Sequence, residues 1–116
     1  MGDYYCTRVW QLKPGASATE VEHLASSGML EMQRWIPGGK RISLLRVTGS
    51  EPRRYLMTMT FANQASYTRW RQVEEEVPDY WERFASILMH WERLCSMVEE
   101  YAGEMVMDVG LDEEYI

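Results

Sequence analysis

The chain has 116 residues and a formal net charge of −6, from 18 acidic residues against 12 basic ones. This length suits one domain with a single hydrophobic core. Nucleic-acid binding draws most of its affinity from basic residues that neutralise phosphates, so the acidic balance argues against a DNA or RNA partner. No stretch is long and apolar enough to span a membrane. The N-terminus lacks a basic region followed by an apolar run, so we expect a cytoplasmic protein.

The two cysteines, Cys6 and Cys95, lie within apolar patterns and have no CxxC spacing. Small buried thiols are common in proteins of reducing compartments, where disulfides are rare. We therefore predict two reduced, buried thiols and no disulfide.

The first part of the chain predicts a strand followed by a helix. Residues 3–12 are rich in aromatic and β-branched side chains, and a Pro-Gly pair after them ends the strand. Ser17 or Thr19 fits as the cap of a helix over residues 19–36. Gly28 weakens this helix, which indicates either a bend or close packing against another backbone.

The middle of the chain predicts a hairpin and a second helix. Residues 40–48 and 54–61 have the composition of strands, and the short turn between them implies antiparallel pairing. Asn63 follows directly and suits the cap of a helix over residues 64–76. The three glutamates at residues 74–76 are interpreted as a solvated helix end.

Residues 78–102 carry the clearest pattern in the sequence. Pro78 suits the first turn of a helix, and Gly103 suits its end. We therefore predict one long helix, followed by a short fourth strand over residues 104–109. The apolar stripe that indicates this helix consists of Trp81, Phe84, Leu88, Trp91, Cys95, Val98 and Ala102.

This order of elements predicts an α+β fold of the ferredoxin-like kind. The order is strand, helix, strand, strand, helix (in two pieces) and strand. This is the βαββαβ arrangement, a four-stranded antiparallel sheet with helices on one face. We expect residues 1–110 to form a single ferredoxin-like α/β-barrel domain. Residues 111–116 then form an acidic C-terminal tail.

Both faces of the predicted sheet carry apolar side chains. In the first strand Trp10 and Leu12 point one way, whereas Tyr5 and Val9 point the other way. A sheet face in contact with water alternates more cleanly with polar residues. Packing a second copy sheet against sheet buries the extra apolar surface, so we predict a homodimer.

Four segments carry a resemblance to a known superfamily: RYLMTMTFAN, QASYTRWRQVEEE, PDYWERFASILMHWERL and EMVMDV. Their order and the aromatic residues after the third strand resemble the dimeric α/β-barrel superfamily. That superfamily includes antibiotic-biosynthesis monooxygenases, stress-responsive barrel proteins, EthD-like proteins and NIPSNAP-like proteins. The resemblance covers nearly the whole chain and implies a ligand held between the sheet and the helices of each subunit. Members of the superfamily differ widely in chemistry, so the fold alone does not define the reaction.

The resemblance implies a pocket, and the sequence supplies candidates to line it. An apolar pocket with a few polar groups suits a small, flat, partly aromatic molecule. The candidate pocket residues are Arg8, Trp10, Trp35, Arg46, Tyr55, Met57, Met59, Tyr67, Trp70, Trp81 and Trp91.

Asn63, His23 and His90 are the candidate catalytic residues. In the cofactor-independent monooxygenases that the chain resembles, an Asn and a Trp help to polarise an oxygenated aromatic substrate, which gives Asn63 and Trp70 this role. A helix cap is the other interpretation of Asn63. Each histidine is either a general base or an ordinary surface residue. Neither has a convincing ligand spacing, so we predict no metal and no cofactor.

Two functional hypotheses follow from these observations. In the first, a homodimeric barrel binds or transforms a small apolar or aromatic molecule, with cofactor-independent oxygenation or isomerisation as the reaction if it is an enzyme. In the second, the barrel dimer is non-catalytic, structural or stress-responsive, and has no small-molecule substrate. Arg53 and Arg54 in the hairpin are interpreted either as an exposed turn or as a contact for an anion.

Overall fold

The fold was analysed in a computed structural model, which describes residues 2–33, 38–76 and 78–111. Within these residues the chain forms four strands and three helices. In chain order they are β1 (Tyr4–Leu12), α1 (Ala18–Gln33), β2 (Gly39–Arg46), β3 (Arg54–Phe61), α2 (Gln64–Glu76), α3 (Pro78–Leu94) and β4 (Cys95–Glu104).

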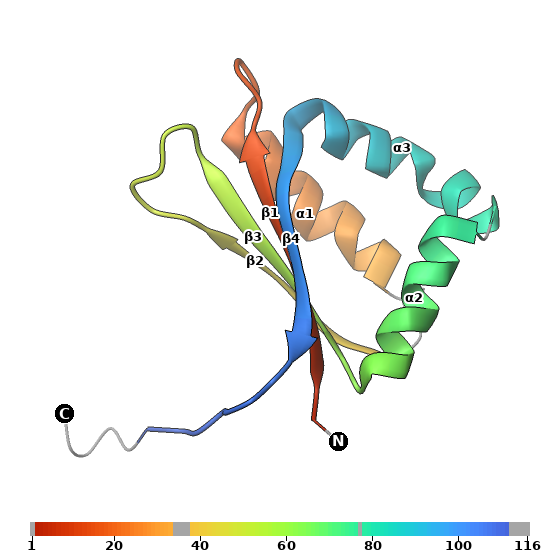
Figure 1. The fold of residues 1–116 in the computed structure, drawn as a ribbon. Coiled ribbons are helices and arrows are strands. Elements are labelled where there is room, and N and C mark those ends of the chain that lie inside the picture. Colours follow the sequence, from red (N-terminus) through yellow and green to blue (C-terminus); the bar gives the residue numbers. More distant parts are fainter. Residues whose placement is uncertain (1, 34–37, 77, 112–116) are drawn as a thin grey trace.

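The sheet has the strand order β2-β3-β1-β4, and every neighbouring pair is antiparallel. The helices all lie on one side of it (Figure 1). This is the βαββαβ arrangement, so the predicted ferredoxin-like fold is confirmed.

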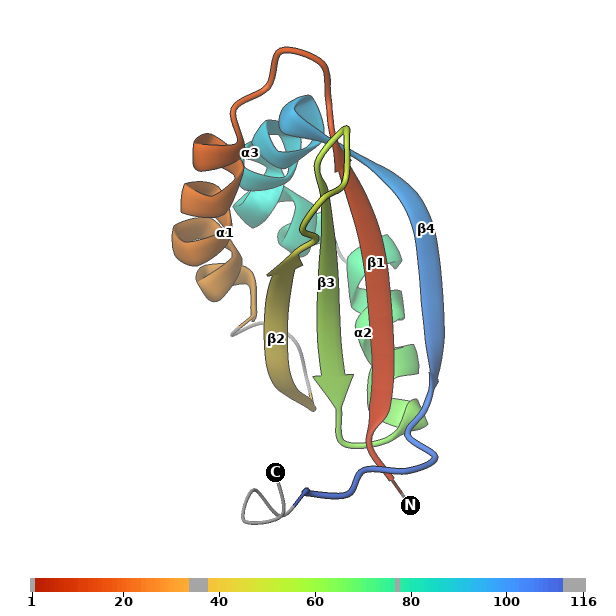
Figure 2. The same ribbon diagram turned by 90° about the vertical axis from the view of Figure 1, so that its left-hand side faces the viewer.

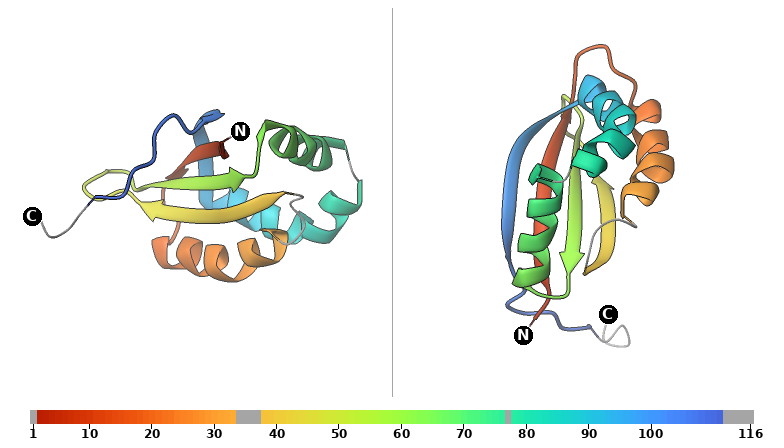
Figure 3. Two further views of the ribbon diagram at one scale, coloured as in Figure 1. Left: turned by 90° about the horizontal axis from the view of Figure 1, so that it is seen from below. Right: turned by 90° about the vertical axis from the view of Figure 1, so that its right-hand side faces the viewer.

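The helices divide the covered face between them. α1 and α3 pack together over the end of the sheet where β1 ends and β4 begins, while α2 lies over the opposite end (Figure 2). The two views of Figure 3 show the same separation of α2 from the α1–α3 pair. Gly28 allows α1 to approach α3, because a Cβ at this position would lie 3.0 Å from the Cγ2 atom of Ile87. The space between the sheet and these separated helices holds the site described below.

The predicted long helix over residues 78–102 is wrong in its last third. α3 ends at Leu94, and the chain continues directly into β4. The apolar period of the stripe extends into Cys95, Val98 and Ala102, but these residues belong to the strand, and Val98 is 41% exposed. The predicted strand over residues 104–109 is also wrong, because only Glu104 belongs to a strand and residues 105–111 lie outside one.

Two interactions explain where α3 ends. The backbone N–H of Lys13 donates to the carbonyl of Leu94 over 2.9 Å, and the Lys13 ammonium donates to the carbonyl of Glu92. These bonds satisfy carbonyls that a helix end leaves unpaired. The residues that follow then pair along the whole of β1, from Leu12 opposite Cys95 to Tyr4 opposite Glu104. The unpaired edge of β1 thus decides the conformation of this segment against its helical periodicity.

The core lies between the sheet and the helices, in two clusters of buried side chains. The larger cluster joins α1 and α3 to β3, and the smaller one joins α2 to β1 and β3. Cys6 and Cys95 are buried free thiols. The larger cluster comprises Val21, Met29, Met32, Tyr55, Met57, Tyr80, Phe84, Trp91, Leu94 and Cys95. The smaller one comprises Tyr4, Cys6, Met59, Phe61 and Trp70.

The opposite face of the sheet is not covered by a helix (Figure 1). The register places Val9 beside Leu56 and Leu56 beside Leu45 on this face. Leu45 is 60% exposed, and Tyr101 of β4 is 59% exposed. An apolar row on an uncovered sheet face is the feature from which the homodimer is predicted.

Candidate functional site

Two cavities lie between the sheet and the helices. The first, here called the aromatic cavity, has a volume of about 520 Å³ and is lined by residues from all the described strands and helices. The second, here called the aliphatic cavity, has a volume of about 470 Å³ and lies between α1 and the strands β2 and β3. Both volumes fall in the range of small-molecule sites.

The structure brings most of the candidate pocket residues to these cavities. Alternation along β1 and β3 directs their inward side chains, including Trp10, toward the helices, and α2 and α3 supply Trp70 and Trp91. The candidates that line the aromatic cavity are Arg8, Trp10, Met57, Met59, Trp70 and Trp91. Those that line the aliphatic cavity are Arg46, Tyr55 and Met57. Their role in binding stays a prediction.

Three candidates have other positions. Tyr67 packs against Tyr4 and Phe61, with ring centroids 4.9 and 5.6 Å away, and is not among the lining residues described for either cavity. Trp35 lies outside the described residues, as does the side chain of Trp81.

The aromatic cavity contains indole N–H groups that have no partner. Trp10 and Trp91 meet edge to face, with ring centroids 5.6 Å apart. Among the described residues, the buried Nε1 atoms of Trp10, Trp70 and Trp91 form no hydrogen bond of good geometry. The Trp70 indole lies close to the Tyr80 hydroxyl and offsets part of the rise that burial causes in the pKa of Tyr80. Trp10 and Trp91 are therefore the clearer donors without a partner. A buried donor without an acceptor costs about 1–3 kcal/mol, and a ligand oxygen would remove that cost.

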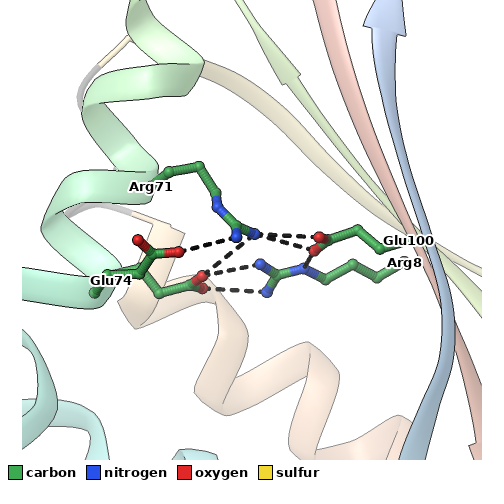
Figure 4. A network of polar contacts seen from close by, with 5 residues as sticks. Arg8, Arg71, Glu74 and Glu100 are labelled. Carbon is green, nitrogen blue, oxygen red and sulfur yellow. Dashed lines mark hydrogen bonds and ion pairs between the residues drawn. The ribbon is translucent and has the colours of Figure 1, made fainter.

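Arginines and glutamates that line the aromatic cavity form a network of hydrogen bonds and ion pairs, which Figure 4 shows. Arg8 of β1 donates from Nη1 and Nη2 to the carboxylate of Glu74 in α2, over 3.1 and 2.9 Å, and from Nε to Glu100 of β4 over 2.6 Å. Arg71 donates to Glu100 over 3.2 Å and to Glu75 over 2.9 Å. The network therefore connects β1, α2 and β4.

Arg8 remains charged although its side chain is only 13% exposed. Burial opposes the charge, but the hydrogen bonds and negative charges of Glu74 and Glu100 outweigh it and raise the pKa of Arg8. The guanidinium carbon also lies 4.9 Å from the ring centroid of Trp70, within range of a cation–π interaction. Arg8 thus contacts both the glutamates of the network and the Trp70 ring that lines the cavity.

Sequence reasoning missed two members of this network. Glu74 was expected at a solvated helix end, but it is ion-paired with Arg8 and 16% exposed. Glu100 was placed in the long helix, whereas in β4 it lies opposite Arg8. One signal was present: Arg8 stands between Cys6 and Trp10 on the inward face of β1, and a buried arginine requires a carboxylate partner.

A second polar cluster lies at the rim of the aliphatic cavity. The Tyr55 hydroxyl donates to Glu22 Oε2 over 2.9 Å, and Arg46 donates to the same carboxylate from Nε over 2.8 Å and from Nη2. The hydrogen bond from Arg46 lowers the pKa of Glu22, to which Tyr55 and Arg53 also contribute. Burial and the neighbouring carboxylate raise the pKa of Tyr55. The polar groups at this rim are therefore paired with each other.

The candidate catalytic residues lie away from both cavities. Asn63 Oδ1 accepts a hydrogen bond of 2.8 Å from the backbone N–H of Ser66, so Asn63 caps α2, and its side chain is exposed. His23 is exposed on α1. His90 Nε2 lies 2.7 Å from Glu20 Oε1 in a surface pair between α3 and α1. None of the three is among the described lining residues of either cavity.

In residues 2–33, 38–76 and 78–111, no group of three or more His, Cys, Asp or Glu side chains is placed to hold a metal ion. Across the same residues, no helix combines the length and apolar character needed to cross a membrane.

Several solved structures share this fold at low sequence identity. SnoaB, a cofactor-independent oxygenase from Streptomyces nogalater, matches with a TM-score of 0.69 at 13% identity, over 94% of this chain and 98% of that one. HapK from Hahella chejuensis matches with a TM-score of 0.68 at 17% identity, over 94% and 98% of the two chains. A NIPSNAP family protein with unknown function from Agrobacterium tumefaciens matches with a TM-score of 0.69 at 16% identity, over 90% and 88%.

Neither a protein-family model nor a curated protein sequence matches the chain. At the identities above, structural similarity establishes the fold. The resemblance predicted from the sequence is confirmed as a likeness of fold to these proteins.

Proposed function

We propose that the protein binds a small, flat, uncharged aromatic molecule in the aromatic cavity and holds a carbonyl or phenolic oxygen of that molecule at the indole N–H groups of Trp10 and Trp91. The observation that supports this proposal is that Trp10 and Trp91, two residues that line a cavity of about 520 Å³, each carry a buried indole N–H without a partner. Aromatic and methionine side chains around them offer an apolar surface for a ring system.

The charges around the cavity favour an uncharged ligand. Four glutamates and two arginines line it, so its lining is net negative. Arg8 and Arg71 are already engaged by carboxylates. An anionic ligand would be repelled by the remaining negative charge, and both arginines among the described lining residues already pair with carboxylates. The lining glutamates are Glu74, Glu75, Glu92 and Glu100.

The reaction we propose is cofactor-independent oxygenation of a phenolic ring. A phenol such as 1-naphthol and one O2 give 1,4-naphthoquinone and one water, so the substrate supplies all the electrons. The contribution of the protein is to orient the ring, to exclude water and to donate hydrogen bonds from Trp10 and Trp91 to the oxygen of the uncharged phenol. The structural similarity to SnoaB, a cofactor-independent oxygenase, supports this choice.

The binding step is tested with fluorenone and fluorene, which differ mainly in one carbonyl oxygen. Replacing Trp10 and Trp91 by phenylalanine should weaken fluorenone binding by roughly two- to tenfold for each hydrogen bond lost. Fluorene binding should fall only as far as the reduced aromatic surface requires. Met89→Leu, at an exposed position of α3, is the control and should bind both compounds as the natural protein does. If neither compound binds the natural protein, the proposal is refuted.

The reaction step is tested separately, by following O2 consumption and quinone absorbance with 1-naphthol and no added cofactor. Turnover that is lost in the Trp10→Phe/Trp91→Phe protein supports oxygenation. Fluorenone binding without turnover of phenols supports a second candidate, a non-catalytic binding protein. The positions of Asn63, His23 and His90 outside the cavities favour this second candidate, because they leave no histidine base among the described lining residues.

We also propose that two copies pack through the uncovered sheet face. Leu45, Leu56 and Tyr101 form an apolar surface there. Residues 105–111 add further exposed apolar side chains, including Val106, which is 97% exposed. Light scattering at micromolar concentration should give twice the mass of one chain, and Leu45→Glu should give a monomer. Met89 is an exposed residue of α3, so Met89→Glu is the matched control, and this variant should remain a dimer. A monomeric natural protein would refute this proposal.

A further inference from the structure

The aromatic and aliphatic cavities share a wall. Met29 of α1, Ile42 of β2 and Met57 of β3 line both of them. Met29 and Met57 are buried members of the larger core cluster, and Ile42 packs against it. The two spaces are therefore neighbours on the same side of the sheet, with α1 beside the β2 edge in Figure 2.

The shared wall is built mainly from flexible side chains. Methionine is unbranched and has three rotatable side-chain bonds, so it adapts to different neighbours at low cost. A rotation of Met29 or Met57 would open this wall between the cavities without moving the backbone. Ile42 is β-branched and stiffer, which makes the methionines the movable part of the wall.

The linings of the two cavities differ in chemistry. Three tryptophans and Tyr80 line the aromatic cavity. In the aliphatic cavity Tyr55 is the only aromatic residue among the described lining residues. Its apolar surface is otherwise formed by Ala25, Leu44 and the three residues of the shared wall. The first space suits a ring with an acceptor oxygen, and the second suits an aliphatic group.

We infer that the two cavities are compartments of one ligand site, in which the aliphatic cavity holds an uncharged alkyl chain attached to the ring in the aromatic cavity. This inference rests on the proposed function, because it requires a ring to bind in the aromatic cavity. The chain is uncharged because the charged side chains among the described lining residues of the aliphatic cavity are paired with each other: Glu22 is held by Arg46 and Tyr55.

The test uses 2-naphthyl alkyl ketones whose acyl chains have two to eight carbons. Dissociation constants are measured by the quenching of tryptophan fluorescence. Each methylene that enters an apolar compartment should tighten binding by about threefold to fourfold. The gain should stop when the compartment is full. The two-carbon ketone measures binding of the ring alone, and the longer ketones measure the second compartment.

Ala25→Phe places a ring in the aliphatic cavity, whereas Ala65→Phe adds the same ring to the exposed face of α2. In the Ala25→Phe protein the gain with chain length should disappear while the two-carbon ketone still binds. The Ala65→Phe protein should keep the full gain. An equal gain with chain length in the natural and Ala25→Phe proteins would overturn the inference.

Carbon-13 spectra of the methionine methyl groups give a second readout in the natural protein, independent of whether Ala25→Phe folds. Lengthening the alkyl chain of the ketone should shift the Met29 and Met57 resonances further. The Met59 resonance should stay at the position it has with the two-carbon ketone, because Met59 lines the aromatic cavity and not the aliphatic one. Chain-length shifts at Met59 without any at Met29 and Met57 would overturn the inference. Failure of the two-carbon ketone to bind would instead refute the proposed function.

Discussion

Replacing Arg8 by glutamine should destabilise the protein, because it removes the ion pairs that join β1 to α2 and β4. The substitution removes the bidentate contact with Glu74 and the bond to Glu100. Glu74 is then left with Arg71, whose nearest nitrogen is 4.0 Å away. Glu100 keeps Arg71 at 3.2 Å. The main cost is therefore the uncompensated carboxylate of Glu74.

The magnitude follows from the burial of this pair. Removing one partner of a fully buried ion pair costs about 3–5 kcal/mol. Because Glu74 remains 16% exposed and Arg71 stays nearby, we expect a loss of about 2–3 kcal/mol in the free energy of unfolding. Loss of the cation–π contact with Trp70 accounts for about 0.5–1 kcal/mol of this. The Arg8→Gln/Glu74→Gln protein should be more stable than the two single losses predict, by about 1–2 kcal/mol.

Urea unfolding at pH 7, followed by far-ultraviolet circular dichroism, measures these differences. Arg69→Gln, an exposed arginine of the same helix as Glu74, is the control and should change stability by less than about 0.5 kcal/mol. If Arg8→Gln costs no more than Arg69→Gln, water screens the network and it does not hold β1, α2 and β4 together.

Three further predictions follow from individual residues. The pKa of Glu22 is lowered in the folded protein, first by the hydrogen bond from Arg46. A carboxylate with a lowered pKa stabilises the folded state above pH about 4.3, and this stabilisation is lost as the pH falls below that value. Glu22→Gln should therefore reduce the loss of stability at acid pH in urea titrations, and an unchanged loss would contradict the assignment. Burial raises the pKa of Cys95 to about 11, so iodoacetamide at pH 8 should label it only after unfolding, and rapid labelling of the folded protein, detected by peptide mass spectrometry, would contradict its burial. Gly38 has φ +72° and a Cβ there would clash with the Ser66 side chain, so Gly38→Ala should cost about 1–2 kcal/mol in the same urea assay, whereas a neutral result would mean that the turn rearranges.

Much of the fold is predictable because local signals agree with the global arrangement. The turn between β2 and β3 and the Asn63 cap before α2 each mark a boundary that the structure places at or near the expected residue. These signals act over a few residues, so they are readable without knowledge of the tertiary structure.

The error at β4 has a different origin. Cys95, Val98 and Ala102 continue the apolar period of α3, so periodicity extends the helix past its true end. What stops α3 is a pair of bonds from Lys13, about eighty residues earlier in the chain, together with the open edge of β1. Neither can be inferred from the local sequence, because tertiary pairing overrides propensity there.

The site was predictable to the extent that it depends on strand alternation. Arg8 and Trp10 of β1, with Met57 and Met59 of β3, reach the cavity because alternate residues of a strand share one face. Which side of a helix faces the cavity is less certain from the sequence, since a polar residue such as His90 or Glu74 fits either side. Their positions depend on how α2 and α3 are rotated over the sheet.

The most direct test of ligand binding in the aromatic cavity is the response of the indole N–H resonances in a proton–nitrogen correlation spectrum. The chain has five tryptophans, and assignment by Trp→Phe substitution identifies Trp10 and Trp91. On addition of fluorenone, both resonances should move downfield as their N–H groups donate to the carbonyl, whereas fluorene should cause only ring-current shifts. Unchanged Trp10 and Trp91 resonances at saturating fluorenone, or the same shifts with fluorene, would contradict the proposal that these donors hold a ligand oxygen.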